Sequence, residues 1–402
     1  MTKLTFSLLS LFPIFLISGN FLINFFYASI SILSILNFNQ NKYFFKSNTF
    51  FLLILFLFYL FINLIFSINF SNSYLRAIKF LLIILFVKEI LNINNKGEII
   101  FEKIVKFWTL VFFVVTVDII FELIFGFNTL GFKSYLEGRI ASFFGDELVV
   151  GSFYHFFSLI VLSYFIKNKY SNLLIILLIL LIISVSFMIG ERANFIKLFF
   201  SISILSFILL KFNFIKKIAI IIITLLIVGN IFYLNDSLKK RYYNQVSIIY
   251  SYNGFIKYFK ESQYGAHQNT AYEIFKDNTL FGVGLKNFRV ESKKSIYENP
   301  DYKKTNERQA THPHQIHLEI LSELGLIGYI CFLILISFSI IVSVKNYLIN
   351  NNPYQLSSLI YIISCLIPLI PSGSIFSTFY GGIFWFSFGL MISFNKKLKF
   401  KV

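Results

Sequence analysis

Apolar runs long enough to cross a lipid bilayer recur along almost the whole chain. A helix needs about twenty predominantly apolar residues to span the hydrocarbon core, and 57% of the 402 residues are hydrophobic, with phenylalanine alone contributing 54. Lipid offers no hydrogen-bond partners, so such runs fold as helices that satisfy their own backbone groups. The sequence therefore predicts an all-α polytopic membrane protein and excludes a water-soluble globule.

The apolar runs predict about 12 transmembrane helices. They cover residues 5–18, 21–38, 49–68, 76–94, 105–124, 150–166, 171–189, 193–210, 216–235, 315–343, 354–371 and 375–394. Only Gly19 and Asn20 interrupt the first two runs, so one tilted helix is an alternative there. We expect residues 1–402 to form a single membrane domain with two long loops, 125–149 and, between the ninth and tenth spans, 236–313.

The lysines of the short loops fall on one side of the predicted bundle. If the N-terminus is cytoplasmic, they gather in cytoplasmic loops, as the positive-inside rule requires. These are Lys42, Lys46, Lys88 to Lys106, Lys167, Lys169, Lys211, Lys216, Lys217, Lys345 and Lys396 to Lys401. The short loops 69–73 and 372–383 on the opposite side contain no Lys or Arg. Both termini are then cytoplasmic, and the formal net charge of +17 gives no reason to expect nucleic acid as a partner.

Ionisable residues gather at the outer ends of the predicted spans. Charge inside a bilayer is costly, so such residues are candidates for function. They are Arg76, Lys79, Asp118, Glu122, Arg139, Glu191, Arg192, Glu319 and Glu323. Arg76 and Lys79 could hold lipid phosphates, but we expect them to snorkel to the headgroups. Asp118 and Glu122 could orient cations across a cavity or simply pair with them.

The outer loop 236–313 is basic, with 13 Lys or Arg against 8 Asp or Glu. Long loops escape the positive-inside trend, so this charge indicates either tolerance or attraction of an anion such as a lipid pyrophosphate. Within the loop, Asn269 to Asp277 has an amphipathic spacing that predicts a short helix on the membrane surface. Gly282-Val-Gly284 is predicted to form a tight turn rather than a phosphate cradle, because no strand precedes it.

The segment Thr311-His312-Pro313-His314-Gln315 ends this loop. Thr311 is predicted to cap the next helix, which places His312 and His314 at its positive end and favours a neutral imidazole base. His314 and His317 share a helix face, but no carboxylate motif accompanies them, so we expect no metal site. We interpret His314 as functional, and His312 and His317 as interface anchors.

Two further features of the C-terminal quarter concern packing. Gly325 and Gly328 are three apart, which lets a neighbouring helix approach closely. Cys331 and Cys365 fall in apolar runs, so we expect neither a disulfide nor a thiolate metal site. Both cysteines are interpreted as packing residues.

The order His314-Gln315, nine residues, Gly325-x-x-Gly328, at the end of a large outer loop, resembles the signature of the O-antigen ligase and polymerase superfamily of bacterial envelope glycosyltransferases. Similarity extends to Gly190-Glu-Arg192, the turn from Phe281 to Phe288, Arg139 with Gly145-Asp-Glu147, and Pro371 to Ser374. Together with the predicted span layout, the resemblance covers nearly the whole chain.

The resemblance implies an activity and a set of site residues. Such enzymes transfer a glycan from undecaprenyl pyrophosphate at the periplasmic face of the bacterial inner membrane, with inversion and, in ligases, without a metal. The resemblance also implies that His314 is the base and that Arg192 is a pyrophosphate ligand. Further phosphate-binding candidates are Arg139, Arg241, Arg289, Arg76 and Lys79, and supporting candidates are Gln315, Glu319, Gly325, Gly328 and His267. Relatives often carry an arginine where this chain has His267, so His267, Arg241 and Arg289 are alternatives for that contact.

Several functions are compatible with these features. A ligase would use lipid A-core as the acceptor, a polymerase would use a second lipid-linked glycan, and a third type of enzyme would use a protein. Membrane lipids are expected partners in each case, and no cofactor is expected. A transporter would bind its substrate near the bilayer midplane, whereas the candidates here gather at one face. A structural scaffold is disfavoured by so many costly charges.

Overall fold

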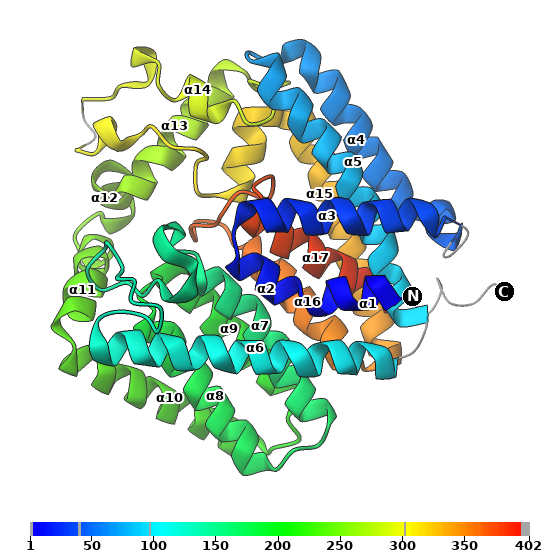
Figure 1. Cartoon of the computed structure of the whole chain (residues 1–402). Coiled ribbons are helices and arrows are strands. Elements are labelled where there is room, and N and C mark those ends of the chain that lie inside the picture. The colour runs from blue at the N-terminus through cyan, green and yellow to red at the C-terminus, as the bar shows by residue number, and fades with distance from the viewer. Residues whose placement is uncertain (1–2, 39–41, 96–97, 301–302, 395–402) are drawn as a thin grey trace.

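The computed structural model describes residues 3–38, 42–95, 98–300 and 303–394, and within these ranges the chain is helical and contains no strand (Figure 1). The predicted all-α class is confirmed there, while the lysines of the 396–401 tail lie outside the described residues. Two short helices, α1 (Lys3–Ser10) and α2 (Phe12–Ile17), come first. The longer helices are α3 (Asn20–Leu36), α4 (Asn48–Asn63), α5 (Phe70–Asn95), α6 (Glu98–Phe125), α7 (Val150–Lys167), α8 (Asn172–Met188), α9 (Arg192–Leu209), α10 (Phe214–Leu234), α15 (Ile316–Asn350), α16 (Pro353–Cys365) and α17 (Phe379–Ser393).

Six described helices are long and apolar enough to cross a membrane by length and composition. They are Asn48–Phe66, Ile100–Phe125, Val150–Lys167, Arg192–Leu209, Phe214–Leu234 and Ile316–Asn350, while α3, α8 and α17 are apolar but shorter. The predicted run 5–18 is divided between α1 and α2, and α16 ends at Cys365 rather than at 371. The coarse pattern of the predicted runs is therefore present, but not a set of twelve helices of full spanning length.

Polar residues set the helix boundaries. Ser47, Ser171 and Asn213 each accept a hydrogen bond from the backbone N–H three residues later, at the starts of α4, α8 and α10. Between α15 and α16, Asn351 adopts a left-handed φ of 49°, Asn352 caps α16, and Pro353 is its first residue. The sequence Asn-Asn-Pro thus ends one helix and starts the next without a loop.

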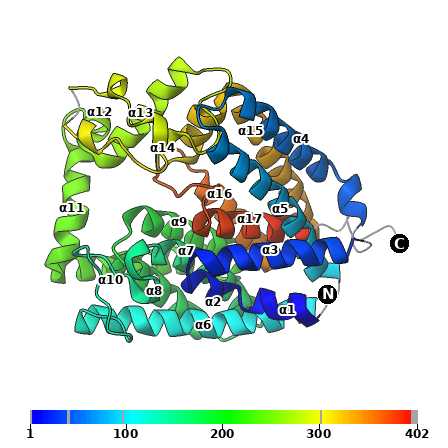
Figure 2. The same cartoon turned by 45° about the horizontal axis from the view of Figure 1, so that its top comes forward.

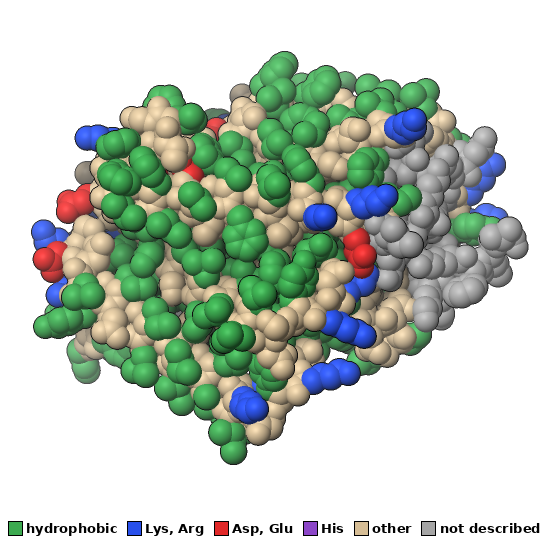
Figure 3. Space-filling model, turned by 60° about the horizontal axis from the view of Figure 1, so that its bottom comes forward, with side chains coloured by type: hydrophobic (Ala, Val, Ile, Leu, Met, Phe, Trp, Pro, Cys, Tyr) green, Lys and Arg blue, Asp and Glu red, His purple; other side chains and the backbone are tan. Residues whose placement is uncertain are grey.

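The centre of the bundle is formed by α7, α16 and α17, whose side chains are nearly all buried. Helix α17 packs on α5 and α16, and α16 packs on α7 and α9 (Figure 2). Aromatic rings fill the contacts, as where Phe12 stacks on Phe386 with centroids 4.3 Å apart. Many hydrophobic side chains also cover the outer face drawn in Figure 3, where charged ones are fewer. An apolar exterior around a filled core is what a lipid-embedded bundle requires.

Helix α15 is broken near its start at Gly325, whose φ of 68° lies in the left-handed region. The break frees backbone groups, and the loop that follows α13 pairs with them. Val283 N donates to Ser322 O (3.0 Å), and Leu326 N donates to Thr279 O (2.8 Å). Gly282-Val-Gly284 therefore forms a bend that pairs with the backbone of α15, and a tight turn closes just after it, where Asn287 N donates to the Gly284 O (3.1 Å).

The two glycines of the signature have different roles. A Cβ at position 325 would lie 2.3 Å from the Leu280 O, so Gly325 permits the close approach of this loop. A Cβ at 328 would lie 2.6 Å from Cε1 of Tyr59 on α4, and the Tyr59 hydroxyl donates to the Leu324 O. The predicted close approach of a neighbouring helix is confirmed at Gly328 but is wrong for Gly325.

The described part of the long segment between α10 and α15 contains four α-helices, α11 (Asp236–Tyr250), α12 (Gly254–Glu261), α13 (Gln263–Asp277) and α14 (Phe288–Glu291). It also contains two short 3₁₀ helices, η4 (Ser295–Tyr297) and η5 (Thr305–Glu307). Helix α13 starts six residues earlier than the predicted amphipathic segment. Its apolar residues Ala271 and Ile274 are fully buried in a small second core with Val283, Phe288 and Tyr297. The prediction that this helix lies on the membrane surface is wrong, because its apolar face is covered by protein.

Gly325→Ala is expected to lower the free energy of unfolding by about 2–4 kcal/mol, because the new Cβ would meet the Leu280 O and alanine is strained at positive φ. Thermal unfolding in detergent, followed by intrinsic fluorescence, measures the effect. Gly229→Ala on α10 is the matched control, since a Cβ there meets nothing within 4 Å. Equal melting temperatures for Gly325→Ala and the wild-type protein would contradict the role given to the break.

Candidate functional site

Three arginines from separate parts of the chain meet at one end of the bundle. Arg192, the first residue of α9, donates from Nη1 to the Arg241 O on α11 (2.9 Å). Arg241 donates from Nε to the Gly190 O (2.7 Å). Arg139, in the loop after α6, places Nη2 3.0 Å from Oε1 of Glu191. We call Arg139, Arg192 and Arg241 the guanidinium cluster.

Two glycines allow the cluster to form. Gly190 has a φ of 76°, and a Cβ there would lie 1.9 Å from the Gly138 O. A Cβ on Gly138 would lie 3.2 Å from the Ser237 O at the start of α11. Any side chain at position 190 would therefore separate the loop that carries Arg139 from the turn that carries Arg192.

Among the described side chains, one carboxylate is paired with the three guanidiniums of the cluster. Glu191 is the buried carboxylate beside it and also accepts a hydrogen bond from Gly151 N (3.0 Å). Burial and then repulsion from Arg139 and Arg192 lower the pKa of Arg241 to about 10, which leaves it charged at neutral pH. Guanidiniums hold phosphate oxygens in a bidentate geometry. The cluster can therefore bind a phosphate-type anion.

Asp118 and Glu122, near the end of α6, hold the loop that carries Arg139. Asp118 accepts hydrogen bonds from Thr129 N (2.8 Å) and Ser142 Oγ (2.6 Å). Glu122 accepts from Ser142 N (2.6 Å). The two predicted roles, orienting cations across a cavity and pairing with them, do not fit these contacts. The two carboxylates instead accept hydrogen bonds from backbone and hydroxyl groups of the loop and position it.

Three histidines and a tyrosine form a second group. The His314 ring lies 5.2 Å from the His267 ring, 4.1 Å from the His312 ring and 5.1 Å from the Tyr264 ring, between centroids. His314 has a φ of 54°, and its carbonyl accepts from Ser372 N (2.8 Å). We call His267, His312 and His314 the imidazole cluster.

Burial is the main cause that lowers the pKa of each histidine in this cluster. The pKa of His314 falls to about 3, with repulsion from His267 as the second cause, and that of His312 falls well below its usual value. The pKa of His267 is also lowered, and its Nε2 lies 2.7 Å from the Glu307 O. A carbonyl only accepts, so His267 carries its proton on Nε2 and leaves Nδ1 without a partner. The three imidazoles are neutral at pH 7.

Tyr264 connects the two clusters. It lies on α13, its ring contacts that of His314, and its hydroxyl is within electrostatic range of Arg192 and Arg241. Tyr258 on α12 is also within electrostatic range of Arg192. The predicted base and the predicted phosphate ligand thus border one site, built from the starts of α9 and α11, from α13, and from the segment before α15.

A second basic group surrounds Lys286, which follows the glycine turn. Its Nζ donates to Ser374 Oγ (2.7 Å) and lies 3.5 Å from Oε1 of Glu319. Glu323 accepts from the Lys286 backbone N–H (2.7 Å). Repulsion from Lys286 is among the causes that lower the pKa of His312, so this group adjoins the imidazole cluster.

Arg76, Lys79 and Arg289 belong with this second basic group. Arg76 donates to the Phe376 O (3.4 Å) and Lys79 to Thr378 Oγ1 (3.0 Å), so both cations have protein partners. Their snorkelling to the headgroups stays a prediction. Arg289 is within electrostatic range of Arg76, and its Nε is buried without a hydrogen-bond partner. The described contacts place these three cations with Lys286 rather than with the guanidinium cluster.

Gln315 caps α15, with its Oε1 accepting from Leu318 N (2.8 Å). The predicted cap at Thr311 is wrong, because the chain turns at His314 and the helix begins only at Ile316. His312 and His314 therefore precede the helix instead of lying in its first turn.

His317, one residue into α15, is held by protein groups through both ring nitrogens. Its Nε2 lies 2.8 Å from the Leu366 O, and its Nδ1 lies 3.1 Å from the Tyr329 hydroxyl. These contacts fit the predicted anchoring role. Among the described residues, no group of three or more His, Cys, Asp or Glu side chains is placed to hold a metal ion.

Three residues of the site were missed by sequence reasoning. Tyr264 lies one helical turn before His267, and Lys286 follows the glycine turn, but neither position is informative without the fold. Lys197 interrupts the apolar run of α9, and a lysine inside a span is a signal that could have been used. It is buried and donates to the Pro371 O (2.7 Å), next to the residue that hydrogen-bonds His314.

Most of this site lies in a segment that is similar to a known protein family. The family model described as O-antigen ligase matches residues 173–333. Over this segment the chain is similar to the O-antigen ligase family. The matched segment runs from α8 into α15 and includes Arg192, Arg241, His267 and His314. No curated protein matches the chain.

The match confirms the resemblance predicted from the sequence. It supports a ligase- or polymerase-type, glycosyltransferase-like activity in lipopolysaccharide biosynthesis. Together with the apolar helices, it supports a multi-pass protein of the bacterial inner membrane.

The lowered pKa values of the buried histidines predict that the free energy of unfolding decreases as the pH falls below 6.5. Unfolded imidazoles titrate near 6.5 while His314 titrates near 3 in the folded protein, so the unfolded state binds more protons in this window. Between pH 6.5 and 5, His314 is expected to lower the free energy of unfolding of the wild-type protein by on the order of 2 kcal/mol, and His314→Gln should lack this part of the decrease. Melting temperatures at both pH values measure it, with the exposed Lys216→Ala as control. An unchanged pH dependence in His314→Gln would contradict the neutral, buried imidazole.

Proposed function

We propose that the protein is an O-antigen ligase-like glycosyltransferase that moves an undecaprenyl-pyrophosphate-linked glycan onto lipid A-core at the periplasmic face. The observation that carries the proposal is the meeting of the guanidinium and imidazole clusters at Tyr264. Guanidiniums suit a pyrophosphate, and a neutral imidazole suits removal of a proton from a sugar hydroxyl. The donor pyrophosphate thus has the guanidiniums as its binding group, and the acceptor hydroxyl has the imidazole.

The proposed topology follows the positive-inside pattern. All twelve apolar runs cross or enter the membrane, residues 1–402 form a single membrane domain, and both termini are cytoplasmic. The loops 125–149 and 236–313 are periplasmic. This orientation places Arg139, Arg241 and His314 on the same side, because all three lie in or next to these loops.

In the proposed reaction, the donor pyrophosphate binds Arg139, Arg192 and Arg241. The acceptor hydroxyl attacks the anomeric carbon while the bond from that carbon to the pyrophosphate oxygen breaks, and His314 accepts the hydroxyl proton. The electron pair leaves with the pyrophosphate, where fixed guanidiniums stabilise it more in the transition state than in the ground state. One displacement inverts the anomeric carbon. The arginines supply the positive charge themselves, so we propose a metal-independent reaction.

The low pKa of His314 makes donor binding part of this mechanism. An imidazole with a pKa of about 3 is a weak base in the empty site. An anion placed nearby favours the protonated form and raises the pKa. Pyrophosphate on the guanidinium cluster would therefore strengthen the base, which favours attack only when the donor is present.

The remaining candidates have supporting roles in the proposal. Gln315, Glu319, Gly325 and Gly328 hold the segment that carries His314, and His267 supports its ring. Arg76, Lys79 and Arg289 bind lipid phosphates beside the second basic group. Their separation from the guanidinium cluster favours lipids over the reacting pyrophosphate.

An O-antigen polymerase is the second candidate, because the family match supports ligase and polymerase activity alike. It would use the same donor and transfer the glycan to a second lipid-linked glycan. Electrophoresis of lipopolysaccharide from a deletion strain separates the two. Loss of all attached chains, with polymer still on its lipid carrier, indicates a ligase, whereas attachment of single repeats indicates a polymerase.

His314→Ala and Arg192→Ala are each expected to reduce glycan attachment by at least about 100-fold, because one removes the base and the other a cation at the leaving group. Arg192→Lys should restore only part of the activity, since an ammonium cannot bind phosphate in a bidentate geometry. Silver-stained lipopolysaccharide measures attachment in complemented deletion strains.

Lys216→Ala, at an exposed site in the predicted cytoplasmic loop, is the control and should retain wild-type attachment. Membrane levels and melting temperatures of all variants show whether they fold. Normal lipopolysaccharide in strains with His314→Ala and Arg192→Ala would overturn the assigned roles.

A further inference from the structure

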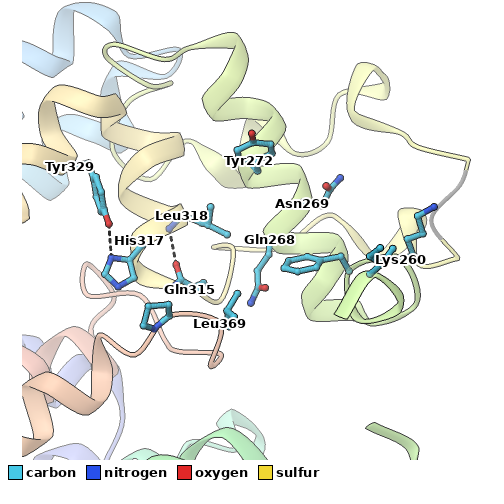
Figure 4. A pocket seen from close by; sticks show the side chains of 12 residues that line it. Lys260, Gln268, Asn269, Tyr272, Gln315, His317, Leu318, Tyr329 and Leu369 are labelled. Carbon is cyan, nitrogen blue, oxygen red and sulfur yellow. Dashed lines mark hydrogen bonds between the residues drawn. The ribbon is translucent and has the colours of Figure 1, made fainter. Parts of the chain in front are cut away.

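A largely apolar pocket of about 590 Å³ lies next to the imidazole cluster. It is bordered by α12, α13, the start of α15 and the segment that follows α16 (Figure 4). Its apolar walls include Ile256, Phe259, Tyr272, Leu318, Tyr329 and Leu369. A concave apolar space with few polar groups is typical of a small-molecule site.

The pocket shares walls with the proposed active site. Gln315 lines it and directly follows His314. Helix α13 turns Tyr264 and His267 toward His314, while Gln268, one residue further, lines the pocket. In the part of the chain that the structure describes, no arginine of the guanidinium cluster lines it. The pocket therefore lies beside the base and apart from the phosphate-binding side.

Gln268 indicates that a polar group belongs in this space. Its side chain extends from α13 toward Leu369 and Gln315 in Figure 4. The residue is only 1% exposed, yet neither amide atom finds a partner with hydrogen-bond geometry. The Tyr258 hydroxyl beside it interacts with the Gln268 side chain, but it is likewise buried without a partner of full hydrogen-bond geometry. Buried polar groups are normally paired, so a ligand that supplies a donor and an acceptor would complete both.

The surface around the pocket indicates that its ligand comes from the membrane. Leu326, Ile327 and Ile330, next to Tyr329 on α15, are exposed apolar residues. They form an apolar path along the helix to the pocket. Lys260, on the wall contributed by α12, is exposed and can meet a lipid phosphate.

We propose that this pocket holds one acyl chain of a lipid-anchored acceptor, with Gln268 bound to the ester or amide that joins the chain to the sugar. The inference rests on the proposed function and adds a lipid subsite to it. An acyl chain fits the volume, whereas an undecaprenyl chain exceeds it. The donor's polyprenyl chain also starts at the guanidinium cluster, on the other side of His314.

Photocrosslinking tests occupancy without any transfer reaction. The full chain in nanodiscs is irradiated with a glucosamine disaccharide lipid that carries a diazirine on one acyl chain, and labelled peptides are mapped by mass spectrometry. Labels are expected on Tyr272, Leu318 and Leu369 and should be lost when excess unlabelled acyl glycolipid is added. Loss of labelling with undecaprenyl phosphate, or equal labelling by a diazirine phospholipid, would overturn the proposal.

Leu369→Trp tests the same site by kinetics, because Leu369 is 50% exposed and a larger side chain there fills the pocket with little strain on the core. It is expected to raise the KM for lipid A-core about tenfold while kcat and the KM for the donor stay unchanged. Gln268→Ala should also raise the KM for lipid A-core. Leu348→Trp, at a 70% exposed site near the other end of α15, is the control and should change neither constant.

The two proposals fail in different ways. If Leu369→Trp transfers glycan normally and the wild-type protein shows no specific crosslink, the acyl subsite is overturned. The proposed function is then unaffected. Specific crosslinking in a protein that transfers no glycan would keep the subsite and overturn the function.

Discussion

The pairing between the broken helix α15 and the loop after α13 is the contact on which the site depends. A break in a helix leaves backbone groups without partners, and lipid cannot satisfy them. Val283, Gly284 and Leu326 restore these hydrogen bonds across the two segments. The same contact fixes α13 against α15 and thereby holds Tyr264 and His267 beside His314. The irregular backbone at this break is thus covered by protein.

Neutral carbonyls hold most of the cations in the site. Arg192 donates to the Arg241 O, Arg241 to the Gly190 O, and Lys197 to the Pro371 O. Such bonds fix the orientation of a cation without neutralising its charge, so the positive potential remains available to an anion. Groups that are already oriented need no rearrangement when charge develops, which is the condition for electrostatic catalysis.

Local signals in the sequence predicted the parts of the fold that depend on neighbours along the chain. Helix positions followed from apolar runs, and the resemblance selected Arg139, Arg192 and Arg241, which the structure brings together. Long-range contacts were not predictable: the loop turn at His314 moved the cap from Thr311 to Gln315, and protein covers the apolar face of α13. Tyr264 gained its position only from the packing of α13, and the count of twelve spans was not confirmed, because several predicted runs form short helices.

Helix α9 connects the two halves of the site. Arg192 starts it, and Lys197 further along hydrogen-bonds Pro371, whose neighbour Ser372 donates to the His314 carbonyl. A tilt of α9 would therefore displace the anion-binding end and the imidazole segment as one unit. Changes in bilayer thickness, which tilt helices, would therefore reach both halves of the site through this one helix.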